Sequence, residues 1–529
     1  MSNKIKKLLN SLENWKENVK FKAFDATGDD ELSQIVAMQR NKDIDGLLSV
    51  WKKKLEQDYF ELPHPDFPSK VTRAVYNSQH GMANFVFMID NENKLPWIFG
   101  QCEGFIDYII THKHHFKASL SNDGPITAQI KNLFKLQQNN LQFRDKRFGF
   151  LLEQTRPYHF FYDHLKYFYF FKSISTNAAS KPLQEKKSFF KTNKKNSSTE
   201  DFTFLFPSVL GNNMLNQRGN SQVKELNEKM EEIVYKDAIQ DLPSQRKENT
   251  LRVWYGITGQ KRSWLQQIEA IDNIVSYLLP HFPSIQIYID GMTAPDSETI
   301  SNYEDEGIFY QITELLDGKC EVHSCIGQDY RYKVKICSTI DFFIANAGTG
   351  CLTPLRFCKK PGVLHSNKRL FTFPDNYSNL IKKFKPEFQL DVPDASMPHR
   401  ADFASYHIPW QHIFNLTAEV LNQTKGTDIK PIEVPAVEDV AKAYAAQEQA
   451  KKKKLMTFTA IESRIKSTDK SPDILREVAL SFEHSGDIAT ALKIMKKALE
   501  LRPNGPFIKK KIIEYYNSIE HSSYKKTIE

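Results

Sequence analysis

The sequence of 529 residues is most informative at first through what it lacks. It contains no run of about 18 apolar residues, the length that indicates a transmembrane helix. Residues 1–20 have neither an uninterrupted apolar core nor a small-residue cleavage site, so we expect no signal peptide. The six cysteines include no CxxC pair, which argues against a zinc site of that kind and favours reduced thiols. We therefore expect a cytoplasmic protein with at most peripheral membrane contact.

Neither sign of charge dominates the chain. Its 72 Lys and Arg residues face 64 Asp and Glu residues, which leaves a net charge of +8. This excess is compatible with anionic small molecules or a membrane surface, and it is too weak to favour nucleic acid as a partner.

The chain also lacks the P-loop pattern GxxxxGK[ST] and the dinucleotide pattern GxGxxG. A different glycine turn lies in residues 338–367, where we predict a strand at Asp341–Ala345, a helix of about ten residues and a strand at Gly362–His365. Such an alternation favours a parallel α/β sheet, which collects ligands at the carboxyl ends of its strands. A turn without a ligand is the open alternative. The candidate ligand-binding residues here are Asn346, Gly348, Thr349, Gly350 and His365.

A second candidate loop, Gly259-Gln260-Lys261-Arg262, follows a predicted strand at Arg252–Ile257. We expect a helix to open at Ser263, because Gln266 stands three residues later in a capping-box spacing. Two cations and the N–H groups of a helix start would suit a diphosphate. An exposed basic turn is the alternative.

The segment RPYHFFYDHLKYFYFF, residues 156–171, concentrates aromatic rings around a few polar groups. One interpretation is an aromatic core segment. The other is an acceptor-side cleft lined by Arg156 and Tyr158, in which Asp163, His159 or His164 removes a proton from an attacking hydroxyl. The histidines of residues 112–115 suggest a polar helix end and no metal site.

We predict a helical segment at 1–60, an α/β domain at 61–242, a second α/β domain at 250–425, a linker and helix at 426–454 and a helical tail at 455–529. The first domain is expected to contain a helix at Gly104–His115 and a solvated basic loop at 173–200. Small residues between Pro472 and Asn504 resemble one tetratricopeptide repeat, which would dock either on the body of the protein or on a protein partner.

With these motifs, Arg252 to Tyr377 resembles the donor half of bacterial GT-B glycosyltransferases, which have two Rossmann-like domains. The resemblance rests on the loop at Gly259, the turn at Gly348 and the segment Pro361-Gly362-Val363. It implies transfer of a sugar from a nucleotide-sugar co-substrate to a glycan or lipid-linked acceptor during capsule or surface polysaccharide synthesis. It also implies no bound cofactor or metal. The segment after Gly350 lacks the acidic residue with which many relatives hold the ribose.

Two other functions stay open. A sulfotransferase would use a different phosphorylated donor, although residues 1–150 show no early basic glycine loop of the kind it needs. A non-catalytic α/β scaffold with a protein-binding tail would leave the loop at Lys261 and the turn at Gly348 without a purpose.

Overall fold

The structure is a computed structural model. It describes residues 21–447 and 471–528, except 93, 120–144, 186, 193–200, 211–220, 241–248, 260, 370–379 and 485. The chain divides into two compact units, residues 1–437 and 438–529. The part of the predicted helical segment before residue 20 and residues 243–248 of the predicted domain joint, Pro243–Asn249, lie outside the described residues.

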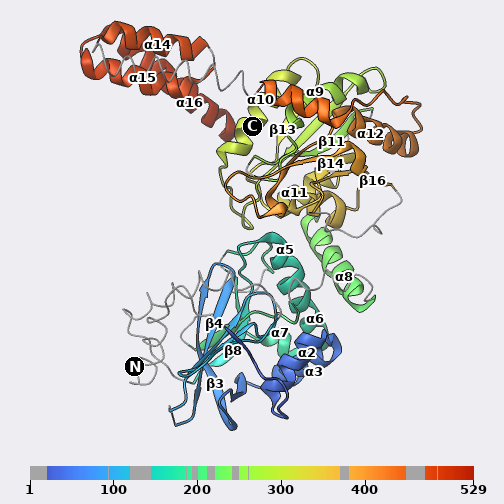
Figure 1. Cartoon of the computed structure of the whole chain (residues 1–529), viewed down its shortest axis with the longest axis vertical. Helices are drawn as coiled ribbons and strands as arrows, with labels where there is room; N and C mark the ends of the chain where they lie inside the picture. The colour runs from blue at the N-terminus through green and yellow to red at the C-terminus, as the bar shows by residue number, and fades with distance from the viewer. Residues whose placement is uncertain are drawn as a thin grey trace. The chain divides into compact units, whose positions relative to one another are not determined.

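The first unit begins with a sheet of strand order β1-β7-β6-β5-β4-β3-β2, in which β2 to β7 pair antiparallel and β1 pairs with β7 in parallel (Figure 1). Its strands are β1 (Lys22–Ala23), β2 (Glu61–His64), β3 (Phe67–His80), β4 (Ala83–Asp90), β5 (Trp97–Gln101), β6 (Tyr108–Ile110) and β7 (His115–Lys117). Only Gly81 and Met82 connect β3 to β4, and Gly81 has a φ of 57°. A turn this short cannot carry the crossover helix of a parallel sheet. The prediction of a Rossmann-like sheet is therefore wrong for β2 to β7.

The predicted helix at Gly104–His115 is also wrong. The carboxylate of Asp107 accepts the backbone N–H groups of Cys102, Glu103 and Gly104 at 2.6, 2.9 and 3.0 Å. These bonds hold a tight turn before β6 where a helix would need its own backbone pairing. The histidines of 112–115 consequently lie in the β6–β7 hairpin, and no helix ends there.

Helices α2 (Glu31–Asn41) and α3 (Ile44–Leu55) pack on this sheet, and α3 buries Leu47, Leu48, Trp51 and Leu55. Asp30 and Asp43 cap them by accepting the N–H groups of Ser33 and Gly46. The helical prediction for 1–60 is thus confirmed for these two helices.

A second small sheet follows, with the parallel order β10-β8-β9. It contains β8 (Arg147–Leu151), β9 (Leu183–Gln184) and β10 (Phe202–Leu205). Within the predicted solvated loop, α7 (Thr176–Ser180) and β9 are ordered and Lys181 lies 4.1 Å from the ring centre of Phe148. The loop prediction is wrong for residues 173–185, because apolar rings hold the basic side chain. Lys194 and Lys195 lie outside the described residues.

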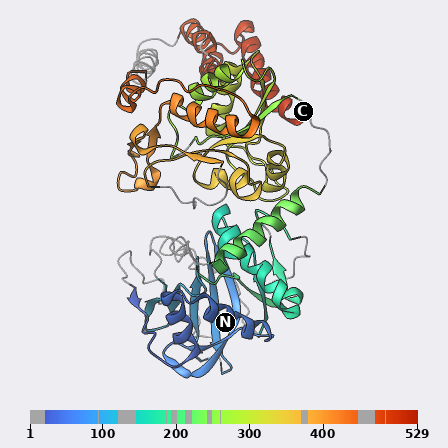
Figure 2. The same ribbon diagram turned by 90° about the vertical axis from the view of Figure 1, so that its right-hand side faces the viewer.

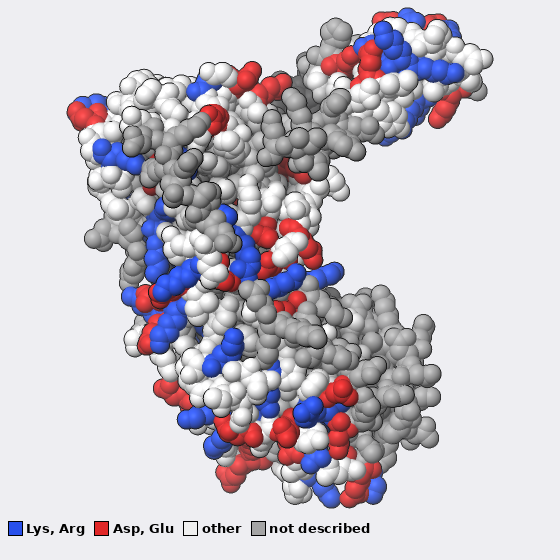
Figure 3. Space-filling model, turned by 180° about the vertical axis from the view of Figure 1, so that it is seen from behind, with Lys and Arg blue, Asp and Glu red and all other residues white. Residues whose placement is uncertain are grey.

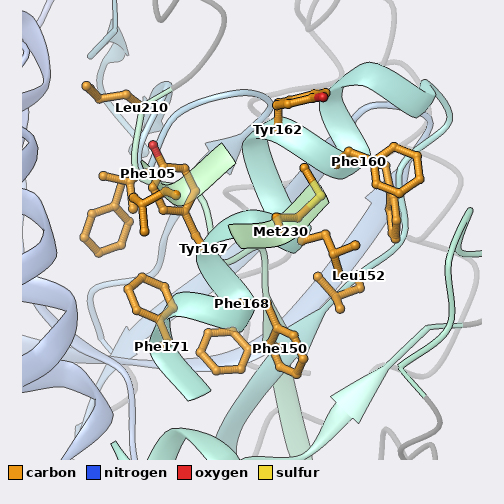
Figure 4. Packing of buried hydrophobic residues seen from close by; sticks show 14 of the residues in the cluster. Phe105, Phe150, Leu152, Phe160, Tyr162, Tyr167, Phe168, Phe171, Leu210 and Met230 are labelled. Carbon is orange, nitrogen blue, oxygen red and sulfur yellow. The ribbon is translucent and has the colours of Figure 1, made fainter. Parts of the chain in front are cut away.

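The aromatic segment forms one continuous helical run: α5 (Pro157–His159), a π-helix η2 (Phe160–Leu165) and α6 (Lys166–Ile174). Figure 4 shows Phe150, Phe168 and Phe171 packed together below Met230. Met230 comes from α8 (Ser221–Ala238), which also packs against α11 (Tyr330–Cys337) and so joins the two halves of this unit. Most of these aromatic rings are therefore core.

The second half of the unit is a parallel sheet with the order β13-β12-β11-β14-β15-β16. Its strands are β11 (Leu251–Gly256), β12 (Ile285–Asp290), β13 (Glu321–Ser324), β14 (Phe342–Asn346), β15 (Gly362–His365) and β16 (Ile381–Lys383). Numbered within the sheet, this order is 3-2-1-4-5-6, that of the doubly wound nucleotide-binding fold. The predicted parallel sheet is confirmed here.

Helices cover both faces of this sheet (Figure 2). The helices α9 (Gln267–Leu278), α10 (Tyr303–Leu316) and α12 (Trp410–Lys425) share one core with Val253 and Tyr255 of β11. Trp254 points the other way, into the core that contains α11. This alternation is what a strand buried on both faces requires. Helix α9 begins at Gln267 with no side-chain cap, and Ser263 instead donates its hydroxyl to the carbonyl of Thr258. The predicted capping box is wrong.

The second unit contains the helices α14 (Pro472–His484), α15 (Ile488–Leu501) and α16 (Pro506–Ile528). Asp487 caps α15, and the small residues Ala479, Ala491 and Ala498 are fully buried where the helices meet. A protein partner bound through these helices stays a prediction. No helix among the described residues has the length and apolar character that crossing a membrane requires.

Candidate functional site

The two candidate loops meet at the carboxyl edge of the parallel sheet. In the order 3-2-1-4-5-6 the connections from β11 and β14 leave in opposite directions, which makes the carboxyl ends of these neighbouring strands the topological switch point. The loop at Gly259 follows β11, and the turn at Gly348 follows β14. The side-chain nitrogen of Asn346 donates a hydrogen bond of 3.1 Å to the carbonyl oxygen of Arg262 and so ties one to the other.

Glycine is required at the start of the first loop. The N–H of Gly259 donates to Asp305 Oδ1 at 2.9 Å, and a Cβ atom at this position would lie 2.7 Å from Glu304 Cβ. Asp305 also accepts the N–H of Met292 at 2.7 Å, after β12. One buried carboxylate in the first turn of α10 therefore fixes the loops that follow two neighbouring strands.

Phe403 contacts this loop through both its aromatic ring and its backbone carbonyl. Lys261 Nζ is 4.0 Å from the ring centre of Phe403, and the guanidinium of Arg400 is 4.5 Å from the same centre. Arg262 has a φ of 57°, a conformation that residues with a Cβ rarely adopt, and its N–H donates to the carbonyl of Phe403 at 3.3 Å. Gln260 lies outside the described residues.

The helix that follows the glycine turn in the chain differs from the predicted one. In place of a ten-residue α-helix there is a 3₁₀ turn η4 (Thr349–Cys351) followed by a π-helix η5 (Leu352–Phe357). Asn346 Oδ1 accepts the N–H of Gly348 at 2.9 Å, which closes the turn. A Cβ atom on Gly350 would meet nothing within 4 Å, so this glycine borders open space.

His365 lies beside Asn346, because the two residues are register partners at the ends of β15 and β14. Its Nδ1 is 2.8 Å from the hydroxyl of Tyr406, which also accepts a hydrogen bond of 2.8 Å from Asn346 Nδ2. Complete burial lowers the pKa of His365 to about 3. The ring centre of Trp264 lies 4.9 Å from that of His365. The imidazole is therefore neutral in the physiological range.

Tyr406 was not predicted as part of the site. It belongs to β18 (Ser405–His407), which pairs with β17 (Leu390–Val392) outside the main sheet. Residues 401–408 contact the first loop and Asn367, whose Nδ2 donates to the carbonyls of Ala401 and Ala404 at 3.3 and 2.9 Å. No glycine or charge pattern identifies such a segment, so the sequence offers no signal for it.

The candidate catalytic residues lie in the aromatic core. His159 Nδ1 and Asp163 Oδ2 are 2.6 Å apart, and both side chains are buried. Burial lowers the pKa of His159, but the hydrogen bond and charge of Asp163 outweigh it and leave this pKa raised. Burial lowers the pKa of His164 to about 3, and its ring packs 4.1 Å from that of Phe206.

The candidate acceptor-side residues stand at the start of the same helix. Arg156 is exposed, and the half-buried ring of Tyr158 stacks on Tyr162 with centres 4.9 Å apart. Tyr162 donates to Glu231 at 2.8 Å, and Arg356 of η5 lies 3.6 Å from the same carboxylate oxygen. A buried polar contact therefore links the aromatic helix to the segment directly after the glycine turn.

Charge of both signs is distributed over the face shown in Figure 3. Among the described residues, no three His, Cys, Asp or Glu side chains gather in a way that could hold a metal ion.

Comparison with known proteins does not assign the chain to a family. No protein-family model and no curated protein matches the chain. Among solved structures, the ADP-heptose LPS heptosyltransferase II of E. coli is 11% identical over 37% of this chain, with a TM-score of 0.24, and the chain spans only 52% of that structure. UDP-GlcNAc 2-epimerase from Neisseria meningitidis is 15% identical over 32% of this chain and 38% of its own, with a TM-score of 0.17.

A TarM variant of S. aureus, in complex with Fondaparinux, alpha-GlcNAc-glycerol and UDP, matches over more of the chain. It covers 80% of this chain and 87% of its own, at 12% identity and a TM-score of 0.19. TM-scores this low carry no argument about function.

Proposed function

We propose that this protein is a glycosyltransferase whose donor half is of the GT-B type, and that it moves a sugar from a nucleotide-activated donor to a glycan or lipid-linked acceptor. The observation that carries the proposal is the joining of the loop at Lys261 to the turn at Gly348 through Asn346 and the carbonyl of Arg262. This junction lies at the switch point of the parallel sheet, where folds of this order bind nucleotides.

In this proposal the donor diphosphate occupies the junction. Breaking the bond between sugar and phosphate leaves negative charge on the departing diphosphate, which fixed cations and N–H groups stabilise. Lys261 and Arg262 supply the cations, while Gly348, Thr349 and Gly350 supply backbone donors. The transfer needs no metal ion, because these groups neutralise the leaving group.

We assign acceptor binding to the aromatic helix, with Arg156 and Tyr158 at its start. If the reaction inverts the anomeric centre, Asp163 or His159 is the general base that takes the proton of the acceptor hydroxyl. The 2.6 Å contact between their side chains supports the assignment, because a carboxylate orients an imidazole and stabilises its protonated form. A retaining reaction would require no such base.

We place this reaction in surface polysaccharide synthesis at the cytoplasmic face of the membrane. The helical second unit would then bind a protein partner of that assembly. These assignments rest on the resemblance of the sequence motifs and of the tail, and they extend the donor-site proposal.

A thermal-shift screen against UDP-, GDP-, CMP- and dTDP-linked compounds tests the donor site. One nucleotide class at ten times its dissociation constant should stabilise the protein by about 1.4 kcal/mol. The variant Lys261→Ala/Arg262→Ala should lose the shift, because each charge-assisted hydrogen bond contributes about 1.5–3 kcal/mol.

The control variant Lys430→Ala/Lys442→Ala removes two exposed cations outside the site. It should respond to the nucleotide as the wild-type protein does. If no nucleotide stabilises the wild-type protein, the donor-site proposal is wrong.

A further inference from the structure

The hydrogen-bond chain that ends at His365 fixes the position of every proton along it. It begins at Gly348, whose backbone N–H can only donate. Its partner at 2.9 Å must therefore be the amide oxygen of Asn346, which settles the orientation of this side chain. The amide nitrogen then faces two acceptors, the carbonyl of Arg262 at 3.1 Å and the hydroxyl of Tyr406 at 2.8 Å.

Tyr406 extends the hydrogen-bond chain from Asn346 to His365. Its hydroxyl oxygen accepts from Asn346, so its single proton is available for His365 Nδ1 at 2.8 Å. Tyr406 is fully buried, and burial raises the pKa of its phenol, so the proton stays on the ring oxygen. Since a buried hydroxyl proton needs an acceptor, Nδ1 of His365 must be the unprotonated ring nitrogen.

The proton of the neutral imidazole then lies on Nε2. This atom is buried, and no described residue provides it with a hydrogen-bond acceptor. The indole of Trp264 stands nearest among the rings, but its nitrogen is itself a donor, to the carbonyl of Ile408 at 2.8 Å, and cannot accept the Nε2–H. His365 consequently presents an oriented and unsatisfied N–H donor, held in place by groups on both sides of the switch point.

We propose that His365 is a binding residue whose Nε2–H donates to an uncharged oxygen of the nucleoside part of the donor, with Tyr406 as the residue that positions it. This inference rests on the donor site proposed above and assigns one contact within it. A neutral donor suits a hydroxyl or carbonyl oxygen, whereas Lys261 and Arg262 supply the positive charge that phosphate oxygens prefer.

The ring of His365 must become accessible when the ligand binds, and the loop that Asn346 contacts contains a residue with a strained backbone. Arg262 is a non-glycine residue at a φ of 57°, and its carbonyl is the atom that Asn346 contacts. A change in its backbone angles would relieve this strain and leave Asn346 with its bonds to Gly348 and Tyr406.

Two measurements on the full-length protein test the proposal. The first is a two-bond ¹H–¹⁵N correlation spectrum of protein labelled with ¹⁵N-histidine, which distinguishes the two neutral tautomers. The signal of His365 is assigned by its loss in His365→Gln. We expect the Nε2–H form in the wild-type protein and a mixture of tautomers in Tyr406→Phe, which lacks the hydroxyl.

The second measurement is calorimetric binding of UDP, UMP and inorganic pyrophosphate, with GDP and GMP as a parallel series. His365→Phe should bind UDP and UMP, or GDP and GMP, about tenfold more weakly, a loss of ~1.4 kcal/mol. Its affinity for pyrophosphate should not change. His365→Gln retains an amide N–H and should recover most of the loss.

His412→Phe is the matched control, because it replaces another buried imidazole that accepts the N–H of Lys385 at 3.0 Å outside this site. It reports the effect of a buried ring replacement on folding and should leave nucleotide affinity unchanged.

A wild-type spectrum with His365 protonated at Nδ1 would overturn the proposal. So would unchanged nucleotide affinity in a folded His365→Phe, or an equal loss for pyrophosphate, which would indicate a phosphate contact. A wild-type protein that binds none of the nucleotides overturns the donor site itself and this contact with it.

Discussion

The side-chain amide of Asn346 lies 3.1 Å from the carbonyl oxygen of Arg262, although the two residues are separated by 84 positions in the chain. This single bond connects the loop after β11 with the turn after β14. Because both belong to neighbouring parallel strands, a ligand held by one is within reach of the other. The amide does this by accepting from Gly348 through its oxygen and donating through its nitrogen.

Replacing Asn346 by Asp tests this connection. The carboxylate still accepts from Gly348, but its second oxygen faces the carbonyl of Arg262 and can no longer donate to it. Removing these donors from a buried site should lower the free energy of unfolding by about 3 kcal/mol and abolish nucleotide-induced stabilisation. Urea denaturation and thermal shift measure the two effects.

Asn422→Asp provides the control. Asn422 also bridges backbone groups through both ends of its amide, donating to the carbonyl of Ile429 and accepting its N–H at 2.9 Å each. It should lose stability but keep the nucleotide response. If Asn346→Asp also keeps that response, the bridge has no part in binding.

The parallel sheet could be predicted because its central strands β11, β12, β14 and β15 are short apolar runs. The edge strand β16 (Ile381–Lys383) carries two lysines and was not predicted. Strand β15 was predicted at its observed bounds. The glycine turn and the basic loop could be located for the same reason, since they must follow these strands. Their connection through Asn346 could not be predicted, because local sequence patterns do not indicate a side-chain hydrogen bond between segments that are far apart in the chain.

The failures have local causes. The segment Gly104–His115 has apolar residues at helical spacing, but Asp107 draws three N–H groups into a turn. These side-chain hydrogen bonds to the backbone stabilise a turn, although the spacing of the apolar residues favours a helix. Tyr406 was missed for a different reason: it is an ordinary strand residue whose importance comes from the atoms it contacts. Nothing in the structure tests the predicted roles of Asp163 and the histidines.

A buried ion pair stabilises the end of β12 next to the site. Lys333 Nζ lies 2.6 Å from Asp290 Oδ1 and donates to the carbonyls of Gly291 and Met292. The variant Lys333→Met leaves the carboxylate of Asp290 buried without its cation, so we expect a loss of about 3–5 kcal/mol in the free energy of unfolding.

The double variant Asp290→Asn/Lys333→Met removes the buried negative charge that Lys333→Met leaves without a cation. It should be more stable than Lys333→Met alone, and a double-mutant cycle by urea denaturation measures the coupling. Equal stabilities of these two variants would show that the pair is not coupled as its geometry indicates.

The second unit should respond to mutation independently of the first. Ala498 is fully buried between its helices, in a core separate from the cores of the first unit. Ala498→Leu overfills this space and should destabilise the unit by about 1–3 kcal/mol. All six tryptophans precede residue 438, so tryptophan fluorescence follows the first unit alone while far-UV circular dichroism follows both.

We therefore expect Ala498→Leu to shift a part of the circular dichroism transition and leave the fluorescence transition in place. Lys493→Leu, on the exposed side of the same helix, is the control and should shift neither by more than about 0.5 kcal/mol. A matching shift in fluorescence would mean that the two units unfold together.

Glu185 should make the stability of the first unit depend on pH. Its carboxylate is 2% exposed and accepts the N–H of Thr192 at 3.0 Å. Burial raises the pKa of Glu185 from 4.5 to about 7, and the nearby charge of Asp296 adds to the rise. Between these values the folded protein holds a proton that the unfolded chain has released, so its stability falls as the pH rises from 4.5 to about 7.

Glu185→Gln carries no titrating group and should lose this part of the slope. After allowance for solvent screening, the difference between the two proteins should amount to about 1–2 kcal/mol across this interval. Urea denaturation at several pH values measures it, with Glu298→Gln as a control at an exposed carboxylate. Parallel pH profiles for the wild-type protein and Glu185→Gln would mean that Glu185 is ionised in the folded state throughout, and that the bond from Thr192 outweighs the cost of burial.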